Sequence, residues 1–237
     1  MKRFLTIIAI VVAVLPLVAC TMTVNGKASN KAGKNITRQV SNVSYFNKIV
    51  TTGAVDIKFV QGSKNAVTIR GTKRLVDNIA VKVDDKTKTL TVSMTNKKRI
   101  VLGKNDKAEV RVTSPDLIAV DLRGAGDFES ERPLDTDNLN VTISGAGDVD
   151  FKSVVCDKAY FTIRGAGDVD VDKLTAKHTD ITLQGAGDVD IDFYNSGSVN
   201  CTLLGAGDIE LEGNVKSLNK KSNGVGNIKT NKLRIER

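Results

Sequence analysis

The chain has 237 residues, with 35 Lys and Arg against 27 Asp and Glu, and it is 41% hydrophobic and 26% charged. This composition excludes a disordered chain, and the three prolines exclude collagen-like and proline-rich classes. The single histidine, His178, and the three cysteines show no metal-ligand spacing, so we expect no metal site built from them.

Residues 1–19 have the pattern of a lipoprotein signal peptide. Lys2 and Arg3 precede a mostly apolar run that ends in Leu17-Val18-Ala19-Cys20. The run is short for a membrane-spanning helix, and a small residue directly before a cysteine resembles the bacterial lipobox. In such lipoproteins, cleavage precedes the cysteine, which then receives acyl chains such as palmitate. We therefore predict lipidation of Cys20, with an ordinary export signal or a membrane anchor as the alternatives.

Residues 20–39 are predicted to be the lipidated cysteine and a flexible basic tether. The segment 21–40 contains four basic residues, no acidic residue and no apolar period. Several acyl chains would hold the protein stably on a membrane. The residues after Cys20 lack the Asp that favours inner-membrane retention in some sorting systems. We therefore expect a lipid-anchored cell-envelope protein at the outer membrane, with the periplasmic or surface side undecided.

Charge is distributed unevenly along the rest of the chain. Residues 41–120 carry a net charge of +8, residues 121–212 carry −12, and residues 213–237 carry +6. The acidic middle would repel phosphate, and the chain has no set of aromatic residues for stacking on bases. We therefore expect no nucleic-acid partner.

Residues 40–237 are predicted to form one all-β domain that is less regular at its start. Apolar and polar residues largely alternate in several short segments before residue 122, which is typical of strands with one buried face. These segments are 55–60, 66–69, 79–83, 90–92 and 110–112. Gly53-Ala54-Val55-Asp56 resembles a degenerate copy of the turn motif that repeats later in the chain.

Gly-Ala-Gly-Asp repeats occupy residues 124–227. The motif begins at Gly124, Gly145, Gly165, Gly185 and Gly205, and a degenerate Gly-Val-Gly-Asn begins at Gly224. A fixed period near 20 residues indicates stacked coils of one supersecondary unit. The glycines indicate a turn that needs a positive φ or a close approach of backbones.

Apolar pairs with period two flank each turn, and no helical period is present in the repeats. Two or three short strands and their turns fit 20 residues, so we predict a parallel β-helix, with an antiparallel sandwich as the runner-up. Cys201 occupies the inward position held by Phe161 and Ile181, so we expect a buried thiol and no disulfide with Cys156. Lys220 and Ser222 take the inward positions of the last coil, as a polar cap requires.

These residues resemble a known family. The opening Tyr45-Phe46-Asn47-Lys48-Ile49-Val50, then Ser114-Pro115-Asp116-Leu117 and the later Gly-Ala-Gly-Asp turns are similar to the "putative auto-transporter adhesin, head GIN domain" family of bacterial exported proteins. The resemblance spans about residues 40–235. It implies a single-stranded right-handed parallel β-helix and a role in adhesion, and it supplies no catalytic residues.

Stacking the coils aligns acidic residues in columns. Directly after the turns come Asp127, Asp148, Asp168, Asp188 and Asp208, which we expect to cap backbone N–H groups of their own turns. Two residues further on, the side chains point outward. The predicted surface binding face consists of Asp150, Asp170, Asp190, Glu210, Asp172 and Asp192. Like charges at ~4.8 Å repel, and one relief is Ca²⁺, as in β-rolls; calcium-stabilised binding is therefore an alternative.

The predicted function is non-enzymatic: adhesion, envelope architecture or ligand binding by a repetitive acidic face. Evenly spaced side chains on a rigid scaffold suit repetitive partners such as glycans, or proteins of the envelope or of a host surface. The rival hypothesis is a pectinase-like carbohydrate-active enzyme, because paired carboxylates cleave glycosidic bonds. Every coil carries nearly the same acids, and His178 is expected to stand alone and exposed at a corner, so we name no catalytic residue.

Overall fold

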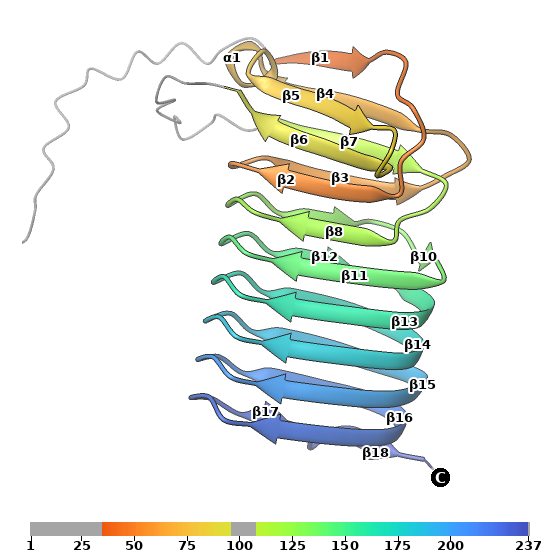
Figure 1. Ribbon diagram of the computed structural model, residues 1–237, viewed down its shortest axis with the longest axis vertical. Coiled ribbons are helices and arrows are strands. Elements are labelled where there is room, and N and C mark those ends of the chain that lie inside the picture. The colour runs from red at the N-terminus through yellow and green to blue at the C-terminus, as the bar shows by residue number, and fades with distance from the viewer. Residues whose placement is uncertain (1–34, 96–107, 237) are drawn as a thin grey trace, which may run out of the picture. The chain divides into compact units, whose positions relative to one another are not determined.

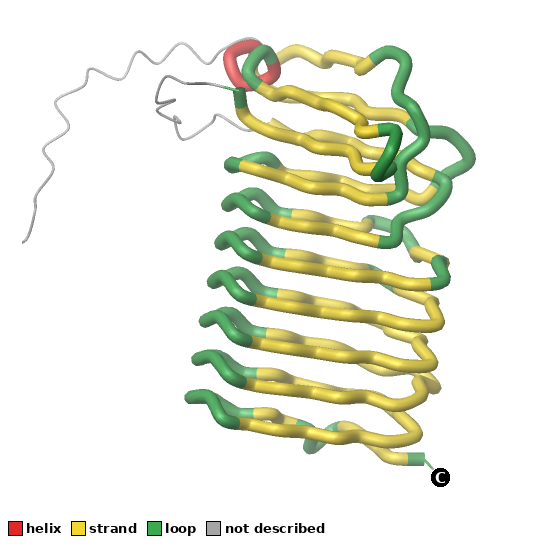
Figure 2. The backbone as a smooth tube through the Cα atoms, in the orientation of Figure 1, coloured by secondary structure: helices red, strands yellow, loops and turns green. Residues whose placement is uncertain are grey.

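The computed structural model describes residues 35–95 and 108–236. The predicted signal peptide, Cys20 and most of the predicted tether lie outside the described residues. Within them, strands dominate and stack as parallel coils, with one short helix at the N-terminal end of the stack (Figures 1 and 2). The prediction of an all-β parallel β-helix is confirmed.

Each regular coil consists of one strand before the glycine turn and one strand after it. In register, residues pair with those about 20 positions further on, as in the series Phe161, Ile181 and Cys201. From β14 onward a single strand of 14 or 15 residues runs from one face around a corner to the other. The strands of this part are β8 (Ala119–Leu122), β9 (Phe128–Ser130), β10 (Leu134–Asp135), β11 (Asn138–Ile143), β12 (Val149–Phe151), β13 (Val154–Ile163), β14 (Val169–Leu183), β15 (Val189–Leu203), β16 (Ile209–Ser222), β17 (Ile228–Lys229) and β18 (Leu233–Ile235).

The hydrophobic core follows the axis of the stack. Because side chains alternate between the two sides of a strand, every second residue of a coil points inward. Phe128 stacks on Phe59 with ring centroids 6.1 Å apart and lies 5.4 Å from the ring of Phe151. Cys156 and Cys201 are free, buried thiols. The absence of a disulfide between them and the burial of Cys201 were predicted from the repeat, whereas the burial of Cys156 was not. Desolvation by burial is the main cause that raises the pKa of each thiol to about 12.

The first glycine turn belongs to a true coil. β2 (Lys48–Thr52) and β3 (Asp56–Gln61) flank Gly53 and pair in parallel with β8 and β9. This confirms the prediction that residues 53–56 are a copy of the repeat turn. On their other side, β2 and β3 pair with β6 (Thr89–Met94) and β7 (Ala108–Ser114), which come later in the chain. The order of the coils along the axis therefore differs from their order in the sequence.

Antiparallel strands and the helix cover the N-terminal end of the stack. β4 (Ala66–Thr72) lies antiparallel to β7, and β1 (Asn35–Val40) lies antiparallel to β4. β5 (Ile79–Asp84) lies antiparallel to β6. Helix α1 (Lys73–Val76) buries Leu75 and Val76 under this layer. The segments of β4 to β7 were predicted as strands, but their antiparallel pairing was not. The prediction of a flexible tether over residues 20–39 is wrong for residues 35–39, which belong to β1 and pair with β4.

The C-terminal coil becomes polar, as predicted. Lys220 and Ser222 take the register positions next to Cys201 and Leu203, and both are exposed. Beyond β16, only the short strands β17 and β18 continue the stack among the described residues.

Candidate functional site

The repeat turns require glycine because neighbouring coils approach closely. A Cβ atom on Gly165 would lie 1.8 Å from the carbonyl oxygen of Gly145, and one on Gly167 would lie 2.0 Å from the carbonyl oxygen of Gly147. No side chain fits at such distances without moving the backbone. Of the two alternatives that the sequence left open, close approach explains the five Gly-Ala-Gly-Asp turns, whose glycines do not have a positive φ.

The aspartate after each turn accepts a hydrogen bond from the next coil. The prediction that it caps its own turn is wrong, because its carboxylate extends along the axis and receives the backbone N–H of the equivalent residue one coil further on. The donors and acceptors are Asp127 to Asp56 (3.3 Å), Asp148 to Asp127 (3.1 Å), Asp168 to Asp148 (2.9 Å), Asp188 to Asp168 (2.7 Å), Asp208 to Asp188 (2.7 Å) and Asn227 to Asp208 (2.9 Å). This turn ladder connects successive coils.

The outward columns beside the turn ladder form a separate acidic surface. Asp150, Asp170, Asp190 and Glu210 are direct neighbours in register on consecutive strands. Asp172 and Asp192 lie two residues further along their strands and are also exposed. We call these six residues the acidic face. At its N-terminal part, a shallow depression of about 500 Å³ is lined by Glu129, Ser130, Glu131, Asp150, Phe151, Lys152, Asp170 and Asp172.

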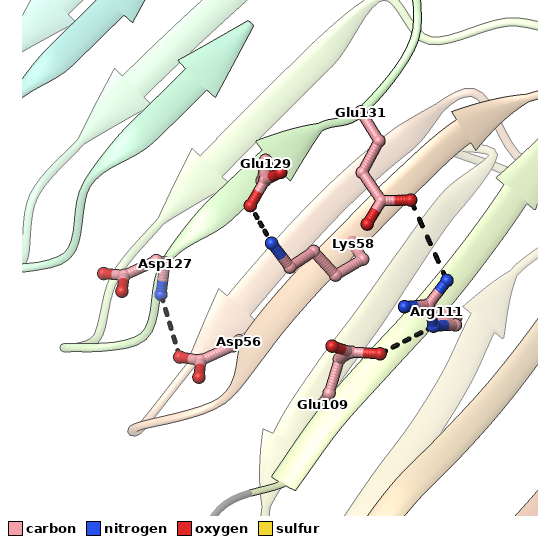
Figure 3. Close-up of polar contacts among 7 residues, drawn as sticks. All are labelled: Asp56, Lys58, Glu109, Arg111, Asp127, Glu129 and Glu131. Carbon is pink, nitrogen blue, oxygen red and sulfur yellow. Dashed lines mark hydrogen bonds and ion pairs between the residues drawn. The ribbon is translucent and has the colours of Figure 1, made fainter.

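Basic side chains lie at the N-terminal boundary of the acidic columns (Figure 3). Lys58 forms an ion pair with Glu129, and Arg111 pairs with Glu109 at 2.6 Å and with Glu131 at 3.8 Å. Lys58 and Arg111 are neighbours in register on β3 and β7. The irregular N-terminal coils thus neutralise the first acids of the columns.

Lysines also neutralise the C-terminal end of the columns. Lys229 contacts Asp208 at 2.7 Å, and Lys232 contacts Glu210 at 3.5 Å and also pairs with Glu212. Within the acidic face, Lys152 pairs with Asp172.

The centre of the acidic face keeps uncompensated charge. Among the described residues, no ion pair within 4 Å involves Asp150, Asp170 or Asp190. Desolvation is the main cause that raises the pKa of each of these carboxyls above its usual value, and neighbouring carboxylates raise it further: Asp170 for Asp150, Asp172 for Asp170, and Asp170 and Glu210 for Asp190. Lys58, Lys152 and Lys232 partly offset this rise for Asp150, Asp170 and Asp190, respectively. The predicted repulsion is therefore relieved by ion pairs at both ends of the columns and at Asp172, and only in part at these three carboxyls.

The acidic face can accept hydrogen bonds and attract cations. Within the described ranges 35–95 and 108–236, no group of three or more His, Cys, Asp or Glu side chains is placed to hold a metal ion. In the turn ladder, one carboxylate oxygen of each aspartate is already occupied by a backbone N–H.

His178 is not isolated at a corner, contrary to the sequence-based expectation. It lies in β14 with a side chain 33% exposed, and its ring nitrogens contact Ser198 Oγ at 2.7 Å and Asp180 Oδ2 at 2.9 Å. Asn200 donates a hydrogen bond to the other oxygen of Asp180. The strand register explains this contact, because His178 on β14 is paired with Ser198 on β15. Sequence reasoning missed this cluster, although the spacing of 20 residues between the two was a usable signal.

This cluster contains the residue types of a hydrolase triad, but within the described residues the strand that carries Ser198 is paired on both sides. Acyl transfer needs backbone or side-chain donors aimed at a developing oxyanion. The strand that carries Ser198 pairs with β14 on one side and with β16 on the other, so the sheet uses its backbone N–H groups. We therefore treat these contacts as a hydrogen-bonded part of the sheet surface.

The comparisons with known proteins identify the family. The family model "Putative auto-transporter adhesin, head GIN domain" matches residues 45–172 and 159–237. The chain belongs to this family. The comparison with curated proteins found no match.

One solved structure supports the same assignment, and two more share the fold. A crystal structure described as a "putative adhesin" from Bacteroides fragilis has a TM-score of 0.68 and 30% identity, covering 83% of this chain and 96% of that chain. A "putative adhesin" from Parabacteroides distasonis is 18% identical with a TM-score of 0.53, covering 82% of this chain and 94% of that one. A "putative lipid binding protein" from the same species is 16% identical with a TM-score of 0.50, covering 86% and 98%. The last two show likeness of fold alone.

The description of the family is that of an adhesin. The Bacteroides fragilis relative is likewise described as an adhesin and not as an enzyme. Among the described residues, no helix has both the length and the apolar character needed to cross a membrane.

Proposed function

We propose that this head GIN domain protein is an exported, lipid-anchored, non-enzymatic adhesin that binds a repetitive polar partner through its acidic face. The observation that carries the proposal is the column of Asp150, Asp170 and Asp190, which are register neighbours and, among the described residues, form no ion pair within 4 Å. The chain neutralises the ends of this column with lysines and leaves its centre open to an external partner.

The chemistry of the acidic face indicates the class of partner. Carboxylates accept hydrogen bonds from hydroxyl groups and form charge-assisted bonds with ammonium groups. A polymer of neutral or amino sugars offers both at regular spacing, and several weak contacts along one chain add up by multivalency. An anionic polyuronate would be repelled. This argues against a pectinase-like enzyme that acts on this face.

Cys20 supplies the proposed anchor. The sequence from Leu17 to Cys20 resembles a lipobox, and the following residues favour the outer membrane. A basic tether would connect the acyl chains to the β-helix. Adhesion requires that the domain face the exterior, so the proposal commits to the cell surface.

A binding assay tests this proposal. The purified full-length protein is incubated with immobilised chitosan, a neutral xylan and polygalacturonate. We compare it with the triple variant Asp150→Asn, Asp170→Asn and Asp190→Asn. A matched control carries Asp135→Asn, Asp137→Asn and Asp157→Asn, which removes the same number of charges from exposed positions outside the acidic face.

We expect the wild-type protein and the matched control to bind chitosan or xylan, and the face variant to bind at least about tenfold more weakly, because three charge-assisted contacts are removed. Undiminished binding by the face variant would contradict the proposal. Turnover of polygalacturonate by the wild-type protein would show that the protein is an enzyme instead.

A further inference from the structure

The last coil leaves a strand edge open. β16 pairs with β15 along nearly its whole length. On the opposite side, β17 pairs only with Ile209 and Glu210, and β18 only with Gly213–Val215. In the part of the chain that the structure describes, no strand lies beyond residues 216–222 (Figure 1). Every earlier coil has a parallel neighbour along this stretch.

The hydrogen-bonding groups of this edge point away from the stack. The N–H of Asn223 donates to Leu203 O at 2.8 Å, so it points back toward β15. In a parallel strand, successive N–H groups alternate in direction. The N–H groups of Ser222, Lys220 and Leu218 therefore point outward. These N–H groups have the spacing of the unpaired donors on an edge strand, to which a further strand can bind.

The side chains around the edge are basic and apolar. Lys216, Lys220 and Lys221 are exposed on the strand itself. Val225 is 79% exposed and Ile235 is 56% exposed at the same end of the stack. Residues 213–237 contain seven basic residues and one acidic residue. An occupant of this edge must therefore bring acidic side chains.

Other parts of this chain do not meet that requirement. The acidic strand segments of β12, β14 and β15 already have strand neighbours on both sides. Residues 96–107 contain five basic residues and one acidic residue, and residues 21–34 contain three basic residues and no acidic one. Two copies joined edge to edge would bring their lysines together, and like charges at that separation repel.

We propose that residues 216–222 of β16 form a docking edge for an extended acidic peptide segment of another protein, which adds as one more strand. Backbone hydrogen bonds would hold the segment, and the lysines would select acidic side chains. Apolar side chains on its other face would cover Leu218, which packs partly buried against the core. This site is separate from the acidic face.

The test uses the full-length protein and a labelled peptide of about eight residues that alternates valine and glutamate, a length typical of strands. Fluorescence anisotropy measures its affinity. Two further peptides serve as controls: one alternates valine and lysine, and one has the acidic sequence with N-methylated backbone amides. We expect binding of the first peptide and at least about tenfold weaker binding of both controls, because one lacks the charge and the other the backbone donors.

Two variants locate the site. Lys220→Pro removes an outward N–H that the fold does not use, and Lys221→Glu reverses an edge charge without a backbone change. Each should weaken binding at least about fivefold, whereas Lys158→Glu, an exposed charge reversal on β13, should leave it unchanged. If Lys220→Pro fails to fold, the affinity of Lys221→Glu for the peptide still tests whether the peptide binds at this edge. The Asn triple variant of the acidic face should bind the peptide normally, so failure here is distinguishable from failure of the proposed adhesin function.

Three results would overturn the proposal. Equal binding of the N-methylated peptide would exclude strand addition. Dimerisation in analytical ultracentrifugation that Lys221→Glu alters would assign the edge to a second copy. Binding to phosphatidylglycerol vesicles that Lys221→Glu abolishes, without peptide binding, would assign it to a lipid surface.

Discussion

The backbone N–H of Asp188 donates a hydrogen bond of 2.7 Å to the carboxylate of Asp168 in the preceding coil. The same bond recurs from turn to turn, so the side chain of one coil satisfies the backbone of the next. The aspartate of each Gly-Ala-Gly-Asp motif therefore connects neighbouring coils rather than its own turn.

Replacing Asp168 with alanine should destabilise the protein by about 1–3 kcal/mol, because the N–H of Asp188 loses a charged acceptor. Asp168→Asn should cost less, since its amide oxygen can still accept the bond. Urea unfolding followed by circular dichroism measures both. Equal stability of the alanine variant and the wild-type protein would show that the turn ladder contributes nothing.

The variant Gly165→Ala should be strongly destabilising, by about 2 kcal/mol or more, because its Cβ would collide with the carbonyl oxygen of Gly145. Ala166→Ser changes an exposed residue in the same turn and serves as the control, with an expected change within about 0.5 kcal/mol. Thermal melts compare the two. A Gly165→Ala variant as stable as the control would refute the close approach of coils.

The variant Asp170→Asn should stabilise the protein at neutral pH. Folding raises the pKa of Asp170 above its ordinary value of 3.8, so the folded protein binds this proton more tightly than the unfolded chain does. The contribution of the Asp170 carboxyl to the free energy of unfolding is therefore lost as the pH rises from about 3.8 through the raised pKa. Removing the charge should add about 0.5 kcal/mol for each like-charged neighbour across the strands.

The stabilisation by Asp170→Asn should shrink as the pH is lowered toward 4 and vanish below the unfolded pKa. Asp208 and Glu212 have lowered pKa values, because Lys229 and Lys232 donate hydrogen bonds to them, and their contributions are lost as pH falls. The difference between variant and wild type isolates Asp170 from them. A pH-independent difference would contradict electrostatic repulsion as its cause.

Cys156 and Cys201 should resist thiol reagents in the folded protein. Burial raises the pKa of both thiols to about 12, so almost no reactive thiolate is present at pH 8. Ellman's reagent should detect both only after unfolding in guanidinium. Rapid modification of either thiol in the folded protein would argue against its inward position.

Lipidation of Cys20 should be lost completely in Cys20→Ser. Wild-type protein expressed in its bacterial host should incorporate radiolabelled palmitate and fractionate with membranes. The serine variant should do neither, because it lacks the sulfur that carries the lipid. Incorporation of label by the serine variant would place the acyl group elsewhere.

The sequence was most informative where structure repeats. The alignment of Phe161, Ile181 and Cys201 indicated which side chains face inward, because period two and period 20 together specify both the face and the coil. The outward direction of Asp150 and Asp170 followed from the same argument. The polar ending at Lys220 was also visible as a break in the pattern.

The features that could not be predicted depend on contacts between residues that are distant in the sequence and have no recognisable motif nearby. Lys58 and Glu129 are distant in the sequence and meet only because β3 stacks on β9, and nothing in the repeat indicates that β6 and β7 lie on the far side of that coil. An Asp after a turn is usually read as a cap of its own turn, so the bond from Asp188 to Asp168 was missed. His178 and Ser198 are in contact because their strands pair in register.

Labelling of intact cells tests the central claim of a surface adhesin most directly. A membrane-impermeant amine-reactive biotin reagent is applied to cells that express the full-length protein, with a periplasmic protein as control. The protein carries exposed lysines on its β-helix, among them Lys158 and Lys221. We predict biotinylation of this protein while the control stays unlabelled. Labelling only after the outer membrane is permeabilised would contradict a role as a surface adhesin.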